Sequence, residues 1–202
     1  MSRAAIFKKI EAATSALKNR TARPDHAATI TDAAPRLEGL DLLEIFARNM
    51  AKVNGRTMRS VAELTAFLTS TGQRHGYCDP ALYPHIGAPL AAAGLGIETE
   101  YDRSRYDDYQ FGITRASGAI AESGTLILDD DGTSRRLAAL SPWTHVAVLE
   151  RAAIHRSIAD ALAAMGESPN IIWVTGPSKT ADVEGILIEG VHGPGEQIAL
   201  VL

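Results

Sequence analysis

Glycine-flanked polar side chains stand immediately before an apolar run in the middle of the chain. They are Glu122, Ser123, Gly124 and Thr125, and Thr114 belongs to the same glycine-rich segment, residues 112–128. A partly desolvated carboxylate beside glycine can approach a ligand closely and act as a base or a nucleophile. The alternative is a turn, in which Glu122 caps neighbouring amides and Gly124 supplies a positive φ.

A second polar loop follows the apolar run at residues 171–175. Its candidate ligand-binding residues are Gly176, Ser178, Lys179, Thr180 and Asp182. Beyond the carboxyl end of a parallel strand, hydroxyls and one ammonium suit a carboxylate or a phosphate. The loop is not a Walker A motif, because no glycine directly precedes the lysine. The alternative is that the hydroxyls cap a turn and that the lysine and the aspartate form a surface ion pair.

One imidazole stands in a glycine-rich turn near the end of the sequence, at residues 190–196. His192 is a candidate acid or base near neutral pH, and Gly193 beside it is a candidate ligand contact. The alternative is a histidine that only forms hydrogen bonds within its turn. His145, which opens an expected strand, is a second histidine that could face the same cleft. The six histidines show no His-x-x-x-His spacing, so no dedicated metal site is expected.

Composition restricts the class of protein. The 202 residues, 46% hydrophobic and 22% charged, suit one compact domain with at most a small appendage. A net charge of −4 without a dense basic stripe argues against nucleic acid as a ligand. The single cysteine, Cys78, leaves no disulfide and no self-contained iron–sulfur cluster, which needs about four thiolates.

The sequence also bears on the compartment. The longest stretch without charge, Pro80–Ile97, contains three prolines and three glycines, so no membrane span is expected. Two lysines directly follow Phe7, where a signal peptide would be apolar. Together with the single cysteine, these features predict a cytoplasmic protein.

Hydrophobic periodicity predicts the elements that must position these side chains. Helices are expected at residues 3–19, 40–53, 61–69 and 151–165, and strands at 111–114, 125–128, 145–149, 171–175 and 198–202. The strand–helix–strand order predicts an α/β fold with a mostly parallel sheet flanked by helices and right-handed crossovers. Residues 1–55 are expected to form an N-terminal helical segment packed on a main domain at 56–202.

Aromatic residues give a further set of expectations. Three tyrosines and three aspartates lie between residues 101 and 109: Tyr101, Tyr106 and Tyr109 with Asp102, Asp107 and Asp108. This acidic, aromatic connector either lines a pocket or an interface, or forms a solvated edge whose rings pack on the core. Trp143 and Trp173 are interpreted first as core or core-rim residues.

Several motifs recur in an order and spacing that are specific together. They are Gly112-Ile-Thr, Ile120-Ala-Glu-Ser-Gly-Thr-Leu, Arg136, Pro142 with His145, Gly176-Pro-Ser-Lys-Thr-Ala-Asp-Val-Glu184 and Gly190-Val-His-Gly-Pro194. This set resembles the LUD-domain family, and within it the stand-alone lactate utilization protein C type. The sequence departs from the family at Ser123, where threonine is usual, and at Lys179, where arginine is common. Lysine keeps the charge but loses bidentate carboxylate geometry.

The resemblance implies both a fold and a function. The fold would be that of the NagB and RpiA sugar-phosphate isomerases, the coenzyme A transferases and formyltetrahydrofolate cyclo-ligase, with residues 56–202 as the LUD-type domain. The function would be a part in oxidising L-lactate to pyruvate beside iron–sulfur partner proteins, which would carry the clusters while this chain carries no cofactor. The chain would bind a small carboxylate or another anionic ligand, with no catalytic signature of its own.

The resemblance also assigns roles to the candidate residues. Lys179 and the hydroxyls of Ser178 and Thr180 would hold the carboxylate, while His192 and Glu122 would move a proton or orient the ligand. Asp182 and Gly193 would complete the cleft. Two alternatives remain: an autonomous enzyme that acts on coenzyme A or phosphate esters, and a non-catalytic assembly factor.

Overall fold

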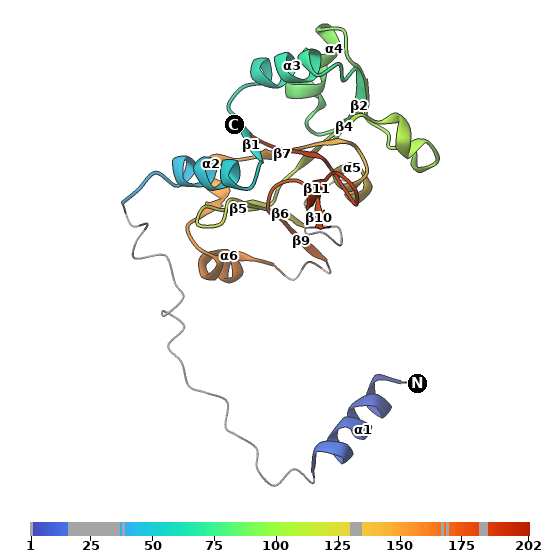
Figure 1. The fold of residues 1–202 in the computed structure, drawn as a ribbon, viewed down its shortest axis with the longest axis vertical. Helices are drawn as coiled ribbons and strands as arrows, with labels where there is room; N and C mark the ends of the chain where they lie inside the picture. Colours follow the sequence, from blue (N-terminus) through green and yellow to red (C-terminus); the bar gives the residue numbers. More distant parts are fainter. Residues whose placement is uncertain are drawn as a thin grey trace. The chain divides into compact units, whose positions relative to one another are not determined.

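The computed structural model describes residues 2–15, 37, 39–129, 135–166, 168, 170–181 and 186–202. The chain divides into two units, residues 1–31 and residues 32–202 (Figure 1). The first unit contains α1 (Arg3–Ser15), in which Ile6, Phe7 and Ile10 are exposed. The helix expected at residues 3–19 is therefore present as α1, and its last four expected residues lie outside the described part of the chain.

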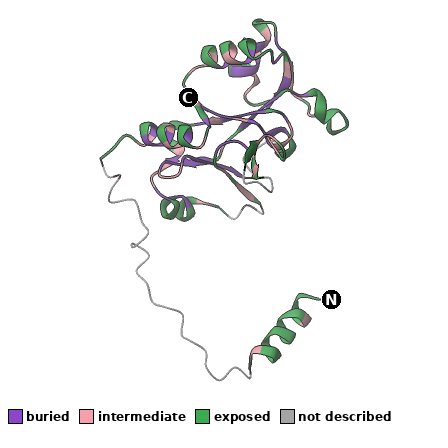
Figure 2. Cartoon of the chain, viewed as in Figure 1, coloured by how far each residue is buried: buried purple, intermediate pink, exposed green. Residues whose placement is uncertain are grey.

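The second unit is built on a six-stranded parallel sheet of order β1-β12-β7-β4-β2-β3. Its strands are β1 (Arg56–Met58), β2 (His75–Cys78), β3 (Gly96–Glu98), β4 (Phe111–Arg115), β7 (Thr144–Leu149) and β12 (Glu196–Val201). The neighbouring strands β12, β7 and β4 are almost wholly buried, as expected for a parallel sheet covered on both faces (Figure 2). The predicted α/β fold with a mostly parallel sheet is confirmed.

Helices cover both faces of this sheet. They are α2 (Leu42–Lys52), α3 (Val61–Ser70), α4 (Ala88–Ala92) and α5 (Arg136–Leu140), whereas α6 (Ile158–Ala164) packs on a second, smaller sheet. The short helical turns are η3 (Tyr83–Gly87), η4 (Arg103–Asp108) and η5 (Arg151–Ala153). Successive strand residues point to opposite faces. Val146 therefore packs in one apolar cluster with α3 and α4, and Ala147 in another with α2. None of the helices described has the length and apolar character needed to span a bilayer.

Local signals set the ends of two helices where the sequence predicts them. The Ser60 hydroxyl accepts a hydrogen bond from Glu63 N and caps α3, and the Glu63 carboxylate accepts one from Arg59 N. After α2, Asn54 has a positive φ of 65° and ends the helix in the left-handed conformation. The chain then turns directly into β1.

A second, four-stranded sheet has the order β8-β5-β6-β9, and β10 (Lys179–Ala181) and β11 (Leu187–Glu189) form a separate hairpin. The strands of the four-stranded sheet are β5 (Gly118–Ile120), β6 (Thr125–Asp129), β8 (Ile154–His155) and β9 (Ile171–Val174). The expected strands 125–128 and 171–175 thus pair antiparallel with each other rather than joining the parallel sheet. The tight turn between β5 and β6 makes these two strands an antiparallel hairpin, and β9 pairs with the other edge of β6.

The helix expected at residues 151–165 is shorter in the structure. The segment begins with η5 and the two-residue strand β8, and α6 starts only at Ile158. Ser157 caps α6 by accepting a hydrogen bond from Asp160 N. The upstream residues pair with β5 instead, so tertiary pairing outweighs their helical periodicity.

Candidate functional site

Two of the three predicted polar segments meet at one cavity of about 250 Å³. One wall is the loop at residues 173–178, the other is the turn at 192–194, and Ala139, Leu140 and Gln197 complete the lining. Backbone hydrogen bonds join the two walls, from Ser178 N to Pro194 O and from Gly190 N to Ser178 O, each at 2.9 Å. The volume is slightly below that of typical drug-sized sites and therefore suits a small ligand.

The cavity lies beside the amino end of the parallel sheet. The loop follows the carboxyl end of β9, as the sequence predicts, but β9 belongs to the second sheet. Gln197, the second residue of β12, contributes the lining from the parallel sheet. The site is therefore formed between the two sheets rather than at the carboxyl ends of parallel strands.

A buried chain of polar side chains runs from this cavity into the parallel sheet. His145 Nδ1 lies 3.0 Å from Gln197 Oε1, and His145 Nε2 lies 2.9 Å from Thr114 Oγ1. Burial lowers the pKa of His145 to about 4, so the ring is neutral at neutral pH. An amide oxygen only accepts hydrogen, so Nδ1 carries the ring proton and Nε2 accepts the Thr114 hydroxyl.

The hydrogen bond from His145 holds the Gln197 carboxamide in place, and the N–H groups of this carboxamide make only weak hydrogen bonds of their own. Gln197 Nε2 has only long contacts, 3.4 Å to His145 O and 3.5 Å to Ile198 O. The N–H groups of this buried amide can therefore serve a ligand oxygen better than their present partners. In the sequence, Gln197 stands between the glycine-rich turn and the strand expected at residues 198–202, and no motif described above includes it.

His192 is the ionisable side chain among the described residues that line the cavity. The imidazole is exposed and makes no hydrogen bond to another residue of the described chain, so both nitrogens are available to a ligand. Gly193 lies against the Ser178 side chain, and a Cβ at position 193 would crowd it. Together, His192, Ser178 and Gln197 offer an imidazole, a hydroxyl and an amide to one small space.

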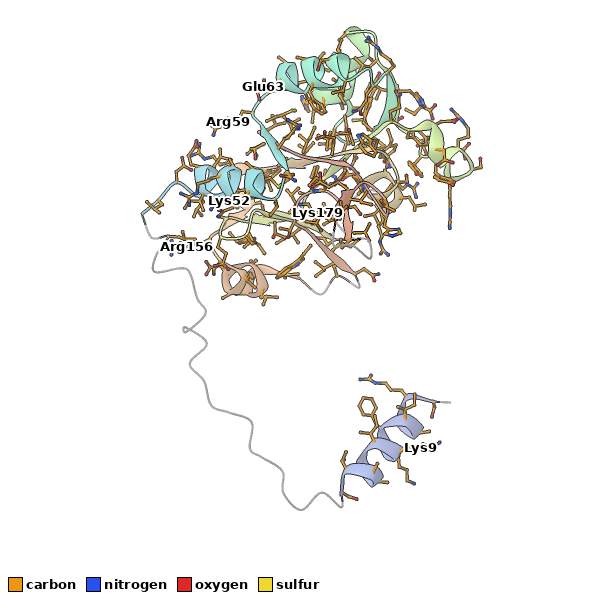
Figure 3. The ribbon with its side chains drawn as sticks, in the orientation of Figure 1. Lys9, Lys52, Arg59, Glu63, Arg156 and Lys179 are labelled. Atoms are coloured by element: carbon orange, nitrogen blue, oxygen red, sulfur yellow. The ribbon has the colours of Figure 1, made fainter. Side chains whose placement is uncertain are left out.

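Lys179 is directed elsewhere. Its Nζ donates to Val53 O at 2.7 Å, at the carboxyl end of α2, and lies 3.5 Å from Glu189 Oε1 (Figure 3). The positive charge thus meets the unpaired carbonyls of a helix C-terminus. Strand residues alternate between faces, so Lys179 points away from the face shared by Ser178 and Thr180.

The Glu122 turn lies beside α2 and α6. Glu122 Oε1 accepts a hydrogen bond from Ile158 N at 2.6 Å and thereby caps α6. Asn49 Nδ2, on α2, donates to the backbone oxygens of Ala121 and Glu122 at 2.9 and 3.0 Å. Gly124 has a φ of 68° and lies so close to the α2 backbone that a side chain would not fit. These contacts hold α2 and α6 on the turn.

A chain of hydroxyls links the Glu122 turn to the cavity. Ser123 Oγ lies 2.7 Å from Thr125 Oγ1, which lies 2.8 Å from Thr175 Oγ1, and Thr175 lines the cavity. Gly176 follows with a φ of 73° and lies against Val53 O, where no side chain fits. Ser123 and Thr125 thus act on the cavity through Thr175.

The structure places only some of the predicted site residues at the cavity. Those that line the cavity are Gly176, Ser178, His192 and Gly193; those joined to it by hydrogen-bonded chains are Thr114, Ser123 and Thr125. Among the described positions, Glu122, Gly124, Lys179 and Thr180 are not part of its lining, and Asp182 lies outside the described residues. Thr175, Trp173 and Gln197 are lining residues that the sequence does not single out as ligand contacts.

Metal ligands and the free thiol are further candidates for chemistry. Within the described ranges, no group of three or more histidine, cysteine, aspartate or glutamate side chains could hold a metal ion. Cys78 is buried, and burial raises the pKa of its thiol to about 12, so it is protonated at neutral pH. The polar groups that the described lining offers to a ligand are hydrogen-bonding groups and the His192 imidazole.

Sequence relatives share a substantial part of the chain. A lactate utilization protein C of Deinococcus radiodurans is 32% identical over 146 residues, covering 67% of this chain and 66% of that protein. Lactate utilization protein C 1 of Bacillus mycoides is 35% identical over 51% of this chain and 47% of its own length. The counterpart from Macrococcus caseolyticus is 37% identical over 41% and 39%. The aligned parts thus span between about two fifths and two thirds of these relatives.

A solved structure confirms the fold. The crystal structure of a DUF162 family protein from Deinococcus radiodurans superposes with a TM-score of 0.58 and 22% sequence identity, covering 79% of this chain and 95% of that one. Residues 82–202, which include both walls of the cavity and the buried polar chain, match the LUD domain. The chain belongs to the LUD domain family.

Proposed function

We propose that this protein takes part in lactate utilization by holding a small carboxylate, L-lactate or pyruvate, in the cavity between the β9–β10 loop and the start of β12. The names of its relatives support the pathway. The observation that carries the site is the convergence of His192, Ser178 and Gln197 on one cavity of about 250 Å³. A ligand of the size of lactate fits within this volume.

Each group has a chemical task in the proposal. The Gln197 amide and the Ser178 hydroxyl donate hydrogen bonds to the carboxylate. His192 accepts the proton of the substrate hydroxyl as lactate becomes pyruvate. As the C2–H bond breaks, its proton leaves to solvent and the two electrons pass to the clusters of iron–sulfur partner proteins beside this chain. Lys179, whose Nζ contacts the end of α2, supports the loop and does not bind the ligand.

An exposed apolar strand supports docking of such a partner. Ile186, Leu187, Ile188 and Val191 on and beside β11 are 56%, 67%, 42% and 52% exposed. Apolar side chains gathered on one strand favour a protein contact. Leu187→Glu is expected to abolish co-purification with the iron–sulfur proteins while lactate binding persists. Leu162→Glu, on the exposed face of α6, is the matched control and should retain the partner.

Ligand binding is tested by thermal shift and isothermal calorimetry of the purified protein with L-lactate, pyruvate and coenzyme A. A ligand at a hundred times its dissociation constant should stabilise the fold by about 2.7 kcal/mol. We expect a shift with L-lactate or pyruvate that is lost in His192→Ala and Gln197→Leu but retained in Lys179→Met. Growth of a deletion strain on lactate should likewise be lost with His192→Ala and Gln197→Leu and retained with Lys179→Met.

Other results would contradict the proposal in distinct ways. A shift with coenzyme A alone, together with turnover in the absence of partners, would favour the autonomous enzyme. Loss of the lactate shift in Lys179→Met but not in His192→Ala would place the carboxylate on the other side of the β10 strand. Partner capture without any ligand shift would favour the assembly factor.

A further inference from the structure

A second cavity, of about 430 Å³, adjoins the first at Gly193, which lines both. Its lining comes from segments that precede four parallel strands: Gln73 before β2, Asp107 before β4, Trp143 before β7, and Glu196 at the start of β12. The cavity therefore lies at the amino edge of the parallel sheet. It is large enough for a ring-sized organic ligand.

The charge of this cavity has one sign. Asp107 and Glu196 are carboxylates, and no lysine, arginine or histidine occurs among the described residues that line the cavity. Arg56 Nε lies 3.0 Å from Glu196 Oε2 and offsets that charge, whereas Asp107 forms no ion pair with a described residue. Arg105, in the same segment as Asp107, is held by Glu98 and Asp108. The cavity is consequently suited to a cation and unsuited to an anion.

Exposed aromatic rings line the same space. Trp143 is 54% exposed and Tyr106 is 50% exposed. The indole of Trp143 packs directly against Gly190 and Gly195, where a Cβ would overlap the ring, and Gly190 has a φ of 80° that favours glycine. The two glycines thus hold a large apolar ring at the cavity instead of in the core. The face of an exposed indole is the preferred aromatic partner of an organic cation.

A buried acceptor completes the set. Gln73 is only 7% exposed, and its Nε2 donates to Thr144 Oγ1 at 2.8 Å. Its Oε1 is buried and has no hydrogen-bond partner within the described chain. An unpaired buried amide oxygen destabilises the protein, and an N–H donor bound in the cavity would remove that cost.

We infer that this cavity binds an organic cation that carries N–H donors on a flat apolar group, as an amidinium or aryl-ammonium does. The N–H groups satisfy Gln73 and Asp107, and the flat part stacks on Trp143. The inference is independent of the proposed carboxylate site, because it rests on a different cavity and on charges of the opposite sign.

The test uses three probes of nearly equal shape that differ in charge: benzamidine, benzamide and benzoate. Binding to the full chain is followed by calorimetry and by tryptophan fluorescence. We expect benzamidine to bind at least about tenfold more tightly than benzamide, and benzoate not to bind. Added salt should weaken the binding of benzamidine and leave the binding of benzamide unchanged.

Variants locate the probe. Asp107→Asn, at an exposed position, should lower the affinity for benzamidine without affecting that for benzamide. Trp143→Leu should lower the affinity for both probes. Trp173→Leu, which removes the tryptophan of the other cavity, is the matched control and should leave the affinity unchanged. Equal binding of benzoate and benzamidine, no binding of benzamidine to the wild-type chain, or an unchanged affinity in Asp107→Asn would each overturn the inference.

Discussion

His145 and Gln197 stand opposite each other on neighbouring parallel strands, and the imidazole Nδ1 donates to the Gln197 side-chain oxygen at 3.0 Å. The contact joins a fully buried ring to a residue that lines the cavity. A neutral imidazole can hold the carboxamide in one orientation without adding charge to the site. The cavity thus obtains a fixed amide donor from residues 52 positions apart in the sequence.

Acid stability should depend on His145. Its pKa is about 4 in the folded protein against an ordinary 6.5, because burial penalises the charged ring. The unfolded chain therefore binds the proton first, and the stability that neutral His145 allows is complete above pH 6.5 and falls as the pH drops toward 4. Between pH 6.5 and about pH 5, urea unfolding should show a loss of about 2 kcal/mol. His145→Asn should lack this part of the pH slope, and parallel slopes for both proteins would contradict it.

The packing of α2 on the Glu122 turn should make Gly124 intolerant of substitution. Gly124→Ala adds both a strained positive φ and an overlap with the Asn49–Met50 backbone, so we expect a loss of about 2–4 kcal/mol in the free energy of unfolding. Gly72→Ala is the matched control, because Gly72 has a similar φ of 74° but open space around it. Its loss should be only about 1 kcal/mol. Equal losses at both positions would show that the α2 backbone does not constrain the turn.

Glu122 should behave as a helix cap. Glu122→Ala removes the acceptor for Ile158 N and should lower the free energy of unfolding by about 1 kcal/mol, as Ser157→Ala should at the same helix end. Neither change should alter the affinity for L-lactate in calorimetry. A normal melting temperature with lost lactate-dependent growth in Glu122→Ala would instead indicate a chemical role for this carboxylate.

Local patterns predict much of this fold, and the failures have a common cause. Ser60 and Asn54 act within one turn of their own helices, so their capping roles follow from sequence. The helix expected at residues 151–165 begins late because Ile154 and His155 pair with β5, and Glu122, 36 residues away, adds an acceptor for Ile158 N beside the Ser157 cap. Such contacts depend on the tertiary arrangement, which periodicity does not contain.

The same distinction applies to the candidate site. The segments at 176–180 and 190–193 are predicted as polar loops, and the structure brings them together. Which of Lys179 and Ser178 faces the cavity depends on the register of β10, and a shift of one residue would exchange them. Trp143 reads as a core residue by type, but the glycines at 190 and 195 hold it at a cavity instead.

Gln197→Glu should separate the two roles of this side chain. The carboxylate still accepts a hydrogen bond from His145 Nδ1, so the fold is retained, but it replaces an amide donor with a negative charge at the lining of the cavity. The affinity for L-lactate should fall by about tenfold or more, since a like charge and a lost donor each oppose a carboxylate. The added charge beside His145 should also raise the pKa of the buried imidazole toward its ordinary value, so the loss of stability between pH 6.5 and about pH 5 should become smaller. Calorimetry and urea unfolding across pH measure the two effects on one protein. If lactate affinity were unchanged while the stability profile shifted, Gln197 would serve the buried chain alone, and the ligand would have to be held by Ser178 and His192 without it.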